Sequence, residues 1–106
     1  MNRYTVIVTE KADEDIFNIG LYIVEELHNL SAAKRLLELV DKRILELELY
    51  PKMHSTIRNK RLREYRKIHV MNFIIFYTVD DSTRTVMVQR VLYGRRDWMH
   101  LLYLDQ

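Results

Sequence analysis

Residues 65–79 read YRKIHVMNFIIFYTV, and residues 85–92 read TVMVQRVL. Both segments are rich in β-branched and aromatic residues, which are enriched in β-strands. They are interrupted at residues 71–72 (MN) and 80–82 (DDS), where Asn and Asp favour tight turns. We therefore predict three consecutive strands, joined as an antiparallel meander, over residues 65–70, 73–79 and 85–92.

The third predicted strand has two faces of different character, because successive side chains of a strand point to opposite sides. Strict alternation places one set of residues on one face and a second set on the other. We expect one of these faces to be mixed in character and available for function. The two sets are Val86, Val88, Arg90 and Leu92, and Met87, Gln89, Val91 and Tyr93.

The first fifty residues follow a helical pattern after a short strand-like segment at residues 4–8. Apolar residues recur every three or four positions over residues 11–27 and again from residue 32 to Pro51. This spacing predicts two amphipathic helices, with Thr9 and Ser31 as their N-caps. Because the link between them is short, the two helices should form a hairpin.

The predicted order of elements is β-α-α-β-β-β, which indicates an α+β domain. We expect the N-terminal helical hairpin to pack on one face of an antiparallel sheet. Residues 52–62 have no clear period and are expected to form a loop or an edge segment, and residues 98–104 a short terminal helix or tail. A chain of 106 residues has the size of one domain, so we expect a single domain over residues 1–106.

The composition excludes several classes of protein. Hydrophobic residues make up 48% and charged residues 30% of the chain, which fits a globular domain and not a disordered one. The sequence has no cysteine, so disulfide-stapled modules, thiolate zinc sites and cysteine nucleophiles are ruled out. We expect no metal site. No apolar run approaches the roughly 20 residues of a membrane span, and no signal peptide is recognisable, so we expect a cytoplasmic protein without membrane contact.

Charge is unevenly divided along the chain. Residues 1–50 carry six Lys or Arg against ten Asp or Glu, whereas residues 51–106 carry eleven against five. The densest basic window has Glu64 as its only acidic residue, and it predicts attraction to a polyanion, either nucleic acid or an acidic protein segment. Its basic residues are Lys52, Arg58, Lys60, Arg61, Arg63, Arg66 and Lys67.

The order of elements, residues 65–79 and the run RVLYGRRDW at residues 90–98 together resemble the RelE/ParE toxin superfamily. The resemblance implies the toxin of a type II toxin–antitoxin pair, with a small cognate antitoxin protein that wraps around it. RelE-like members cut mRNA on the ribosome, and ParE-like members inhibit DNA gyrase. We expect a ribosome-dependent mRNA endonuclease that inhibits translation. A gyrase inhibitor without nuclease activity and a non-toxic nucleic-acid-binding domain are the alternatives.

RNA cleavage through the ribose 2′-OH needs a base, an acid and cations that balance the charge on the phosphate. The resemblance implies catalytic cations and an aromatic or imidazole group on the strands and at the end of the last one. A phenol is mostly protonated at neutral pH, so Tyr93 suits an acid or a stacking ring, and His69 suits the base. The candidate catalytic residues are Arg63, Arg66, Arg90, Tyr93 and His69, and Lys60, Arg61, Lys67, Arg95 and Arg96 are candidates for nucleic-acid binding. No small-molecule cofactor is expected.

Three residues near the end of the chain have simpler structural interpretations. Trp98 is expected to anchor the tail on the sheet, since its side chain buries a large area. Gly94 would allow a positive φ at the end of the strand. Asp97 would form an ion pair with Arg95 or Arg96.

Overall fold

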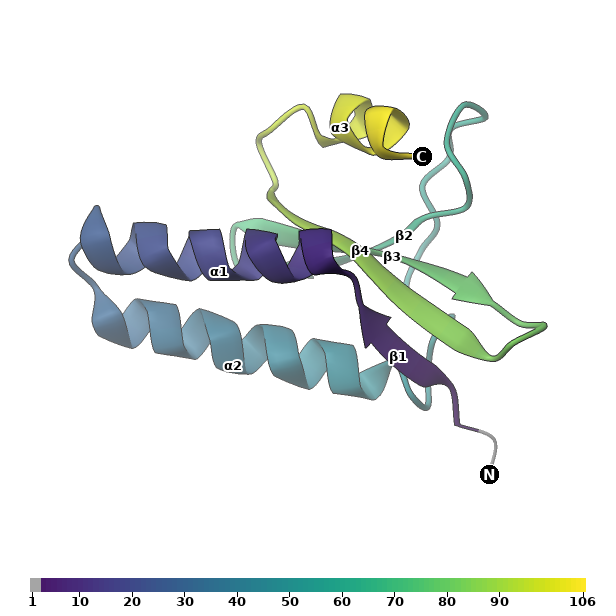
Figure 1. Ribbon diagram of the computed structural model, residues 1–106, viewed down its shortest axis with the longest axis horizontal. Coiled ribbons are helices and arrows are strands. Elements are labelled where there is room, and N and C mark those ends of the chain that lie inside the picture. Colours follow the sequence, from purple (N-terminus) through teal and green to yellow (C-terminus); the bar gives the residue numbers. More distant parts are fainter. Residues whose placement is uncertain (1–2) are drawn as a thin grey trace.

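The computed structural model describes residues 3–106, which form a four-stranded sheet with helices on both faces (Figure 1). The helical hairpin covers one face, and a short C-terminal helix lies over the other. The elements in chain order are β1 (Thr5–Val8), α1 (Glu10–Glu25), α2 (Leu30–Glu46), β2 (Arg66–Val70), β3 (Phe73–Asp80), β4 (Thr85–Tyr93) and α3 (Trp98–Asp105).

The sheet is mixed, with strand order β1-β4-β3-β2. The meander of β2, β3 and β4 is antiparallel, which confirms the prediction for these three strands. β1, however, pairs with β4 in parallel, so the expectation of a purely antiparallel sheet is corrected. A local sequence pattern identifies a strand but not its partner.

Side-chain caps fix the start of both long helices. The Thr9 hydroxyl accepts a hydrogen bond from the Ala12 amide at 3.1 Å, as predicted. α2 begins slightly before the predicted position, and its N-cap is Asn29 instead of Ser31, with the Asn29 side chain accepting from the Ala32 amide at 3.0 Å. Either residue type can cap a helix, so the apolar period alone did not distinguish them.

The larger core lies between the hairpin and the sheet. Its central members from the hairpin are Leu36 and Val40, which are each 2% exposed, and from β3 they are Ile75 and Tyr77, which are fully buried. The Tyr77 hydroxyl donates to the Pro51 carbonyl at 2.8 Å, which ties the loop after α2 to this core. Burial of these side chains provides the main driving force for the fold.

A β-bulge in β4 changes which residues share a face. Tyr77 pairs with Val88 while Phe76 pairs with Arg90, so Gln89 is the extra residue. Val88 packs in the hairpin-side core, whereas Arg90 and Leu92 point to the opposite side of the sheet. The prediction that these three share one face was therefore wrong, because the bulge shifts the alternation by one residue.

The smaller core lies on the other face, beneath α3 and the loop that precedes β2. Phe76 and Leu102 are fully buried there, and Leu92 is 2% exposed. The Trp98 ring packs on Phe76 at 5.1 Å between ring centroids, so Trp98 anchors the C-terminal segment on the sheet. This segment is a helix, which is one of the two forms that the sequence allowed.

Candidate functional site

The predicted site residues lie on two faces of the sheet. Lys67, His69 and Arg90 face the α3 side, as their cross-strand partners Phe76 and Ile74 do. Arg66 faces the hairpin side, where its guanidinium donates to the carbonyls of Lys52 and His54 at 3.2 and 2.6 Å. The sheet therefore separates Arg66 from the other cations of β2 and β4.

An open pocket of about 340 Å³ lies at the end of the sheet where β2, β3 and β4 meet their turns. It brings together three predicted site residues, namely His69, Tyr93 and Arg95. Tyr93 packs against Phe73 with ring centroids 5.8 Å apart, and its side chain remains exposed. His69 borders this solvent-open space from the α3 side of the sheet and Tyr93 from the hairpin side, since Tyr93 pairs with Phe73, which packs on the hairpin-side core.

Gly94 forms part of this pocket and has a different role from the predicted one. No glycine among residues 3–106 has a positive φ, so backbone freedom is not the reason for glycine here. The Gly94 amide donates to the Asn72 carbonyl at 2.8 Å, and a Cβ at position 94 would lie 3.3 Å from that oxygen. A side chain would therefore crowd the Asn72 carbonyl and the Ile74 side chain, and both residues line the pocket.

Arg90 is held by two carboxylates. Its guanidinium donates to both oxygens of Asp15, at 2.7 and 3.0 Å, and to Asp105 at 2.7 Å. Only about 10% of its side chain is exposed, and the hydrogen bond with Asp15, the largest cause, raises its pKa. In this conformation Arg90 joins α1, β4 and α3 and does not face solvent as a free cation.

Asp105 is the second carboxylate of this network, and its other oxygen accepts a hydrogen bond from Lys11 at 2.7 Å. Burial raises the pKa of Asp105, but the hydrogen bonds from Lys11 and Arg90 outweigh it and hold the pKa below its ordinary value. Asp15, Lys11 and Asp105 were not among the residues predicted from the sequence. In the sequence each of the three is only a charged residue on or next to a predicted helix. Helices with a solvent-exposed face carry such residues as well, so this pattern does not indicate a network.

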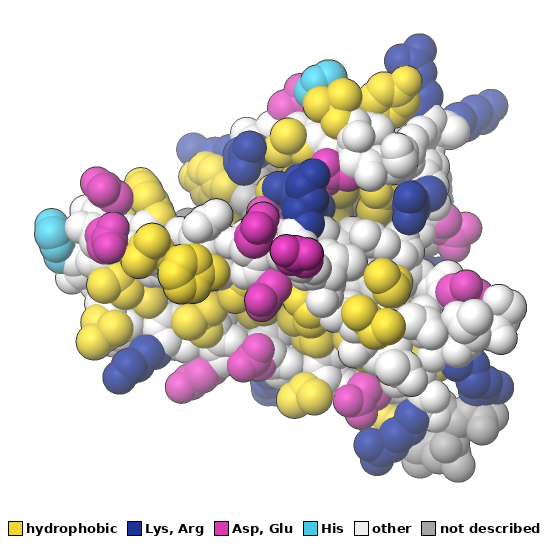
Figure 2. Space-filling model, in the orientation of Figure 1, with side chains coloured by type: hydrophobic (Ala, Val, Ile, Leu, Met, Phe, Trp, Pro, Cys, Tyr) yellow, Lys and Arg dark blue, Asp and Glu magenta, His cyan; other side chains and the backbone are white. Residues whose placement is uncertain are grey.

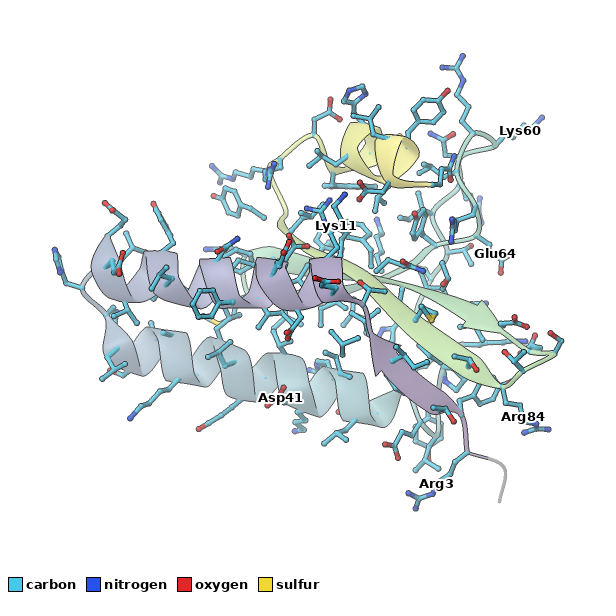
Figure 3. The ribbon with its side chains drawn as sticks, in the orientation of Figure 1. Arg3, Lys11, Asp41, Lys60, Glu64 and Arg84 are labelled. Atoms are coloured by element: carbon cyan, nitrogen blue, oxygen red, sulfur yellow. The ribbon has the colours of Figure 1, made fainter. Side chains whose placement is uncertain are left out.

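The basic loop before β2 extends beside α3. Lys60 and Arg61 are exposed in it, and Figure 3 shows Lys60 at the loop, pointing away from the sheet. Arg63 lies over the Tyr65 ring at 5.9 Å from its centroid. Gln106 hydrogen-bonds to this loop, because its side chain accepts from the Arg63 amide at 2.8 Å and donates to the Arg61 carbonyl. These cations are grouped together, apart from the His69 pocket.

The turn after β4 carries Arg95 and Arg96, which are both exposed. Arg96 lines an adjacent, mainly apolar groove of about 650 Å³, which runs between the end of the hairpin and the sheet. Tyr93 borders both the groove and the pocket. Asp97 is the N-cap of α3 and accepts from the His100 amide at 3.4 Å, so the predicted ion pair with either arginine is not formed.

Two further observations concern ligands and membranes. Among residues 3–106, no three His, Asp or Glu side chains gather in a way that could hold a metal ion. In the same part of the chain, no helix combines the length and the apolar character that crossing a bilayer requires.

The outer surface of the hairpin is unusually apolar for a solvent-exposed helix pair. Figure 2 shows hydrophobic side chains spread over α1 and α2, with acidic side chains gathered near the start of α1. Phe17 is 67% exposed, and Leu27 and Leu30 are 56% and 58% exposed. A patch of this kind is typical of a surface that another protein covers.

The amino-acid sequence is similar to that of a known protein family. Residues 6–98 match the family described as the ParE toxin of the type II toxin–antitoxin system parDE. Comparison with curated proteins finds no match.

Solved structures share the fold at low sequence identity. The chromosomal ParDE toxin–antitoxin system from P. aeruginosa gives a TM-score of 0.71 at 14% identity, covering 88% of this chain and 98% of the other. A mutant of the E. coli toxin RelE in the free state gives 0.66 at 16%, covering 97% and 96%. The RelBE2 toxin–antitoxin complex from Mycobacterium tuberculosis gives 0.63 at 24%, covering 86% and 98%.

The structural matches include both RelE and ParE toxins, so the fold does not distinguish the two activities. The sequence match to the ParE toxin family covers most of the chain. The resemblance seen in residues 65–98 is thereby confirmed. The chain belongs to the ParE toxin family of type II toxin–antitoxin systems, within the RelE/ParE superfamily.

Proposed function

We propose that this toxin cleaves mRNA on the ribosome, and that the pocket at the end of the sheet is its reaction site. The observation that supports the proposal is that His69, Tyr93 and Arg95 all border one open pocket. These side chains supply the three kinds of group that cleavage through the 2′-OH needs. Arg63, Arg66 and Arg90 lie outside this pocket, so we assign the phosphate contact to Arg95.

In the proposed reaction the His69 imidazole accepts the proton of a ribose 2′-OH, and that oxygen attacks the neighbouring phosphorus. Arg95 balances the negative charge that grows on the phosphate oxygens. The Tyr93 phenol donates its proton to the leaving 5′-oxygen. The products are a 2′,3′-cyclic phosphate and a 5′-OH end, and His69 and Tyr93 return to their starting protonation by exchange with water.

We further propose that a cognate antitoxin protein binds this toxin. The RelBE2 structure from Mycobacterium tuberculosis and the RelE–RelB structure from Pyrococcus horikoshii are complexes of toxins with antitoxins. The apolar outer surface of the hairpin offers an amphipathic segment of such a partner an area to bury. The exposed arginines and lysines of residues 58–63 would attract its acidic residues.

Inhibition of DNA gyrase without catalysis is the second candidate. Two observations favour it: the sequence match is to the ParE family, and Arg90 is held by two carboxylates instead of facing a substrate. A surface contact with gyrase would need no assembled set of acid, base and cation. The two candidates therefore differ in whether side chains of the pocket are essential.

The deciding experiment is brief induction in cells without antitoxin, followed by primer extension on abundant mRNAs and by electrophoresis of a plasmid to measure supercoiling. Wild type is compared with His69→Gln, Tyr93→Phe and Arg95→Ala. Arg35→Ala, which removes an exposed arginine from α2, is the matched control. We expect new cuts within translated codons for wild type and control, and cleavage lowered about 10²- to 10⁴-fold when the base is removed.

Intact mRNA together with changed supercoiling would contradict the nuclease and support gyrase as the target. Cleavage that persists in all three pocket variants would show that the reaction site lies elsewhere. No change in mRNA or supercoiling would indicate a domain that only binds nucleic acid.

A further inference from the structure

Three side chains form a row across the α3-side face of the sheet. Lys67 of β2 pairs with Phe76 of β3, and Phe76 pairs with Arg90 of β4. Neighbouring strands lie about 4.8 Å apart, so the backbones of the two cations are separated by roughly 10 Å with an aromatic ring between them. A cation, an aromatic platform and a second cation are the elements that bind a single strand of nucleic acid by stacking and charge.

Side chains of α3 contact all three residues of this row. The Trp98 ring packs on Phe76 at 5.1 Å with 39° between the ring planes, and the Lys67 ammonium lies 5.6 Å from the centroid of the same indole. At the other end Asp105 accepts a hydrogen bond from Arg90 at 2.7 Å. The indole therefore lies where a base would stack, and the carboxylate lies where a phosphate would bind.

The Asp105 carboxylate forms two ion pairs, one through each of its oxygens. One of its oxygens accepts from Lys11 and the other from Arg90, each at 2.7 Å, and its side chain is 17% exposed. Figure 3 shows Lys11 on the first turn of α1, on the side that faces α3. Two cations from different elements thus hold one anion between them, in the arrangement that also suits two oxygens of a phosphate.

α3 itself is not built as a permanent surface helix. Met99, Tyr103 and Leu104 are 38%, 50% and 63% exposed, while Leu102 is fully buried, so the helix carries apolar side chains on its outer as well as its inner side. A surface helix normally confines its apolar residues to one stripe. It is attached by a small core, the Asp105 pairs, the contact between Asn59 and Met99, and the hydrogen bonds of Gln106.

We propose that the row Lys67–Phe76–Arg90, with Lys11, is a binding site for a single strand of nucleic acid, and that α3 fills it with Trp98 in place of a base and Asp105 in place of a phosphate. Movement of α3 away from the sheet opens the site. Asp15 stays paired with Arg90 and keeps its guanidinium oriented, while the nitrogen released by Asp105 becomes free for a phosphate.

This inference deepens the proposed function, on which it rests for the identity of the strand as substrate. His69 lies two residues beyond Lys67 on the same face of β2, so the β2 end of the row lies next to a residue that borders the pocket. Binding to the row, however, is measured separately from cleavage. Loss of one does not imply loss of the other.

The test measures binding of a short fluorescent 2′-O-methyl RNA, which cannot be cleaved through its 2′ position, by anisotropy at several salt concentrations. Asp105→Asn is compared with wild type. Asp41→Asn, which removes an exposed carboxylate from α2, is the matched control for the change in net charge. We expect Asp105→Asn to bind about five-fold tighter or more, with a salt slope steeper by about 0.7 for each cation released. The control should stay near wild type.

A second variant holds α3 in place. The Asn59 amide contacts the Met99 sulfur at 2.9 Å, and the natural chain has no cysteine, so Asn59→Cys combined with Met99→Cys adds the only thiols. The oxidised form should bind the RNA more weakly than wild type, and reduction should restore binding. This comparison uses one protein in two redox states and does not depend on the folding of Asp105→Asn.

Equal binding by Asp105→Asn and Asp41→Asn, or equal binding by the oxidised and reduced forms, would overturn the proposal. If binding responds as expected while induced cells show no mRNA cuts, the site stands and the nuclease fails. If mRNA is cut while RNA binding is unaffected by Asp105→Asn and by the disulfide, the proposed nuclease activity is supported and the α3-covered site is contradicted.

Discussion

The two faces of the sheet are held by different forces. Among residues 3–106, thirteen buried side chains on the hairpin face form one continuous core, to which α1, α2 and three of the four strands contribute. In the same part of the chain the core on the α3 face has seven buried side chains, and Arg90 with its two carboxylates completes the attachment. Apolar burial contributes most to the stability of a folded domain, so the hairpin face carries the fold. The α3 face is held partly by charges that a ligand could replace.

The hairpin and the sheet therefore form the stable part of the domain, and α3 is a helix that covers the other face and is held less firmly. Buried apolar contacts have no ready substitute in solution, whereas a carboxylate on an arginine can be exchanged for another anion. The ion pair of Arg90 with Asp105 can therefore be replaced by a ligand, whereas the packing of Leu36 cannot.

Arg90→Met is expected to have the largest effect. Removing one partner of a buried ion pair leaves Asp15 largely buried without its cation, which typically costs about 3–5 kcal/mol in the free energy of unfolding. Urea denaturation followed by circular dichroism measures this loss. Adding Asp15→Asn should restore most of it, because the amide oxygen can still accept from the Val91 amide, which donates to Asp15 at 3.0 Å. A double variant as unstable as Arg90→Met would show that the cost does not come from the orphaned carboxylate.

Leucine truncations on the two faces are expected to destabilise different parts of the molecule. Leu36→Ala removes a side chain that is 2% exposed in the hairpin-side core, and should lower the global stability by about 3 kcal/mol. Leu102→Ala removes a fully buried side chain beneath α3, and we expect it to loosen mainly that helix. Hydrogen exchange read by mass spectrometry distinguishes the two. Faster exchange of α1 and α2 in Leu102→Ala would mean that the two cores form one cooperative unit.

Acidification is expected to have the smallest effect and to act on the two faces in different pH ranges. Burial lowers the pKa of His54, whose ring lies beside Tyr77 on the hairpin side. Because the folded protein disfavours the charged imidazole, stability is complete above about pH 6.5 and declines as the pH falls below it. The pKa of Asp105 is also lowered, so its contribution is present above about pH 3.8 and is lost as the pH falls further.

Stability measured from pH 7 to pH 3 checks both effects. His54→Gln should remove the decline below about pH 6.5, and Asp105→Asn, which has no carboxylate to protonate at position 105, should remove the Asp105 contribution to the decline below about pH 3.8. A wild-type protein whose stability is constant between pH 7 and pH 5 would contradict the assignment to His54.

Much of the fold could be predicted from local pattern. The apolar period over residues 11–27 located α1 to within two residues at each end, and the β-branched segments located β2, β3 and β4 with similar accuracy. Thr9 was recognised as a cap because a helix N-terminus needs an acceptor close in sequence. Ten candidate site residues were named from their chemistry and from the family resemblance. Three of them, His69, Tyr93 and Arg95, border one pocket, whereas the predicted catalytic arginines at positions 63, 66 and 90 do not.

The remaining features depend on contacts between residues far apart in sequence. The bulge at Gln89 lies where the pairing of β4 with β1 ends, and it sets which face Arg90 occupies. Asp15 lies 75 residues from Arg90 and Lys11 lies 94 residues from Asp105, so no local pattern could indicate these pairs. The helices, the meander and the kinds of side chain available for chemistry could be predicted from the amino-acid sequence, because they follow from the periodicity and the properties of neighbouring residues. Which cations are free and which are bound became clear in the folded chain alone, because that depends on which carboxylates lie within hydrogen-bond distance.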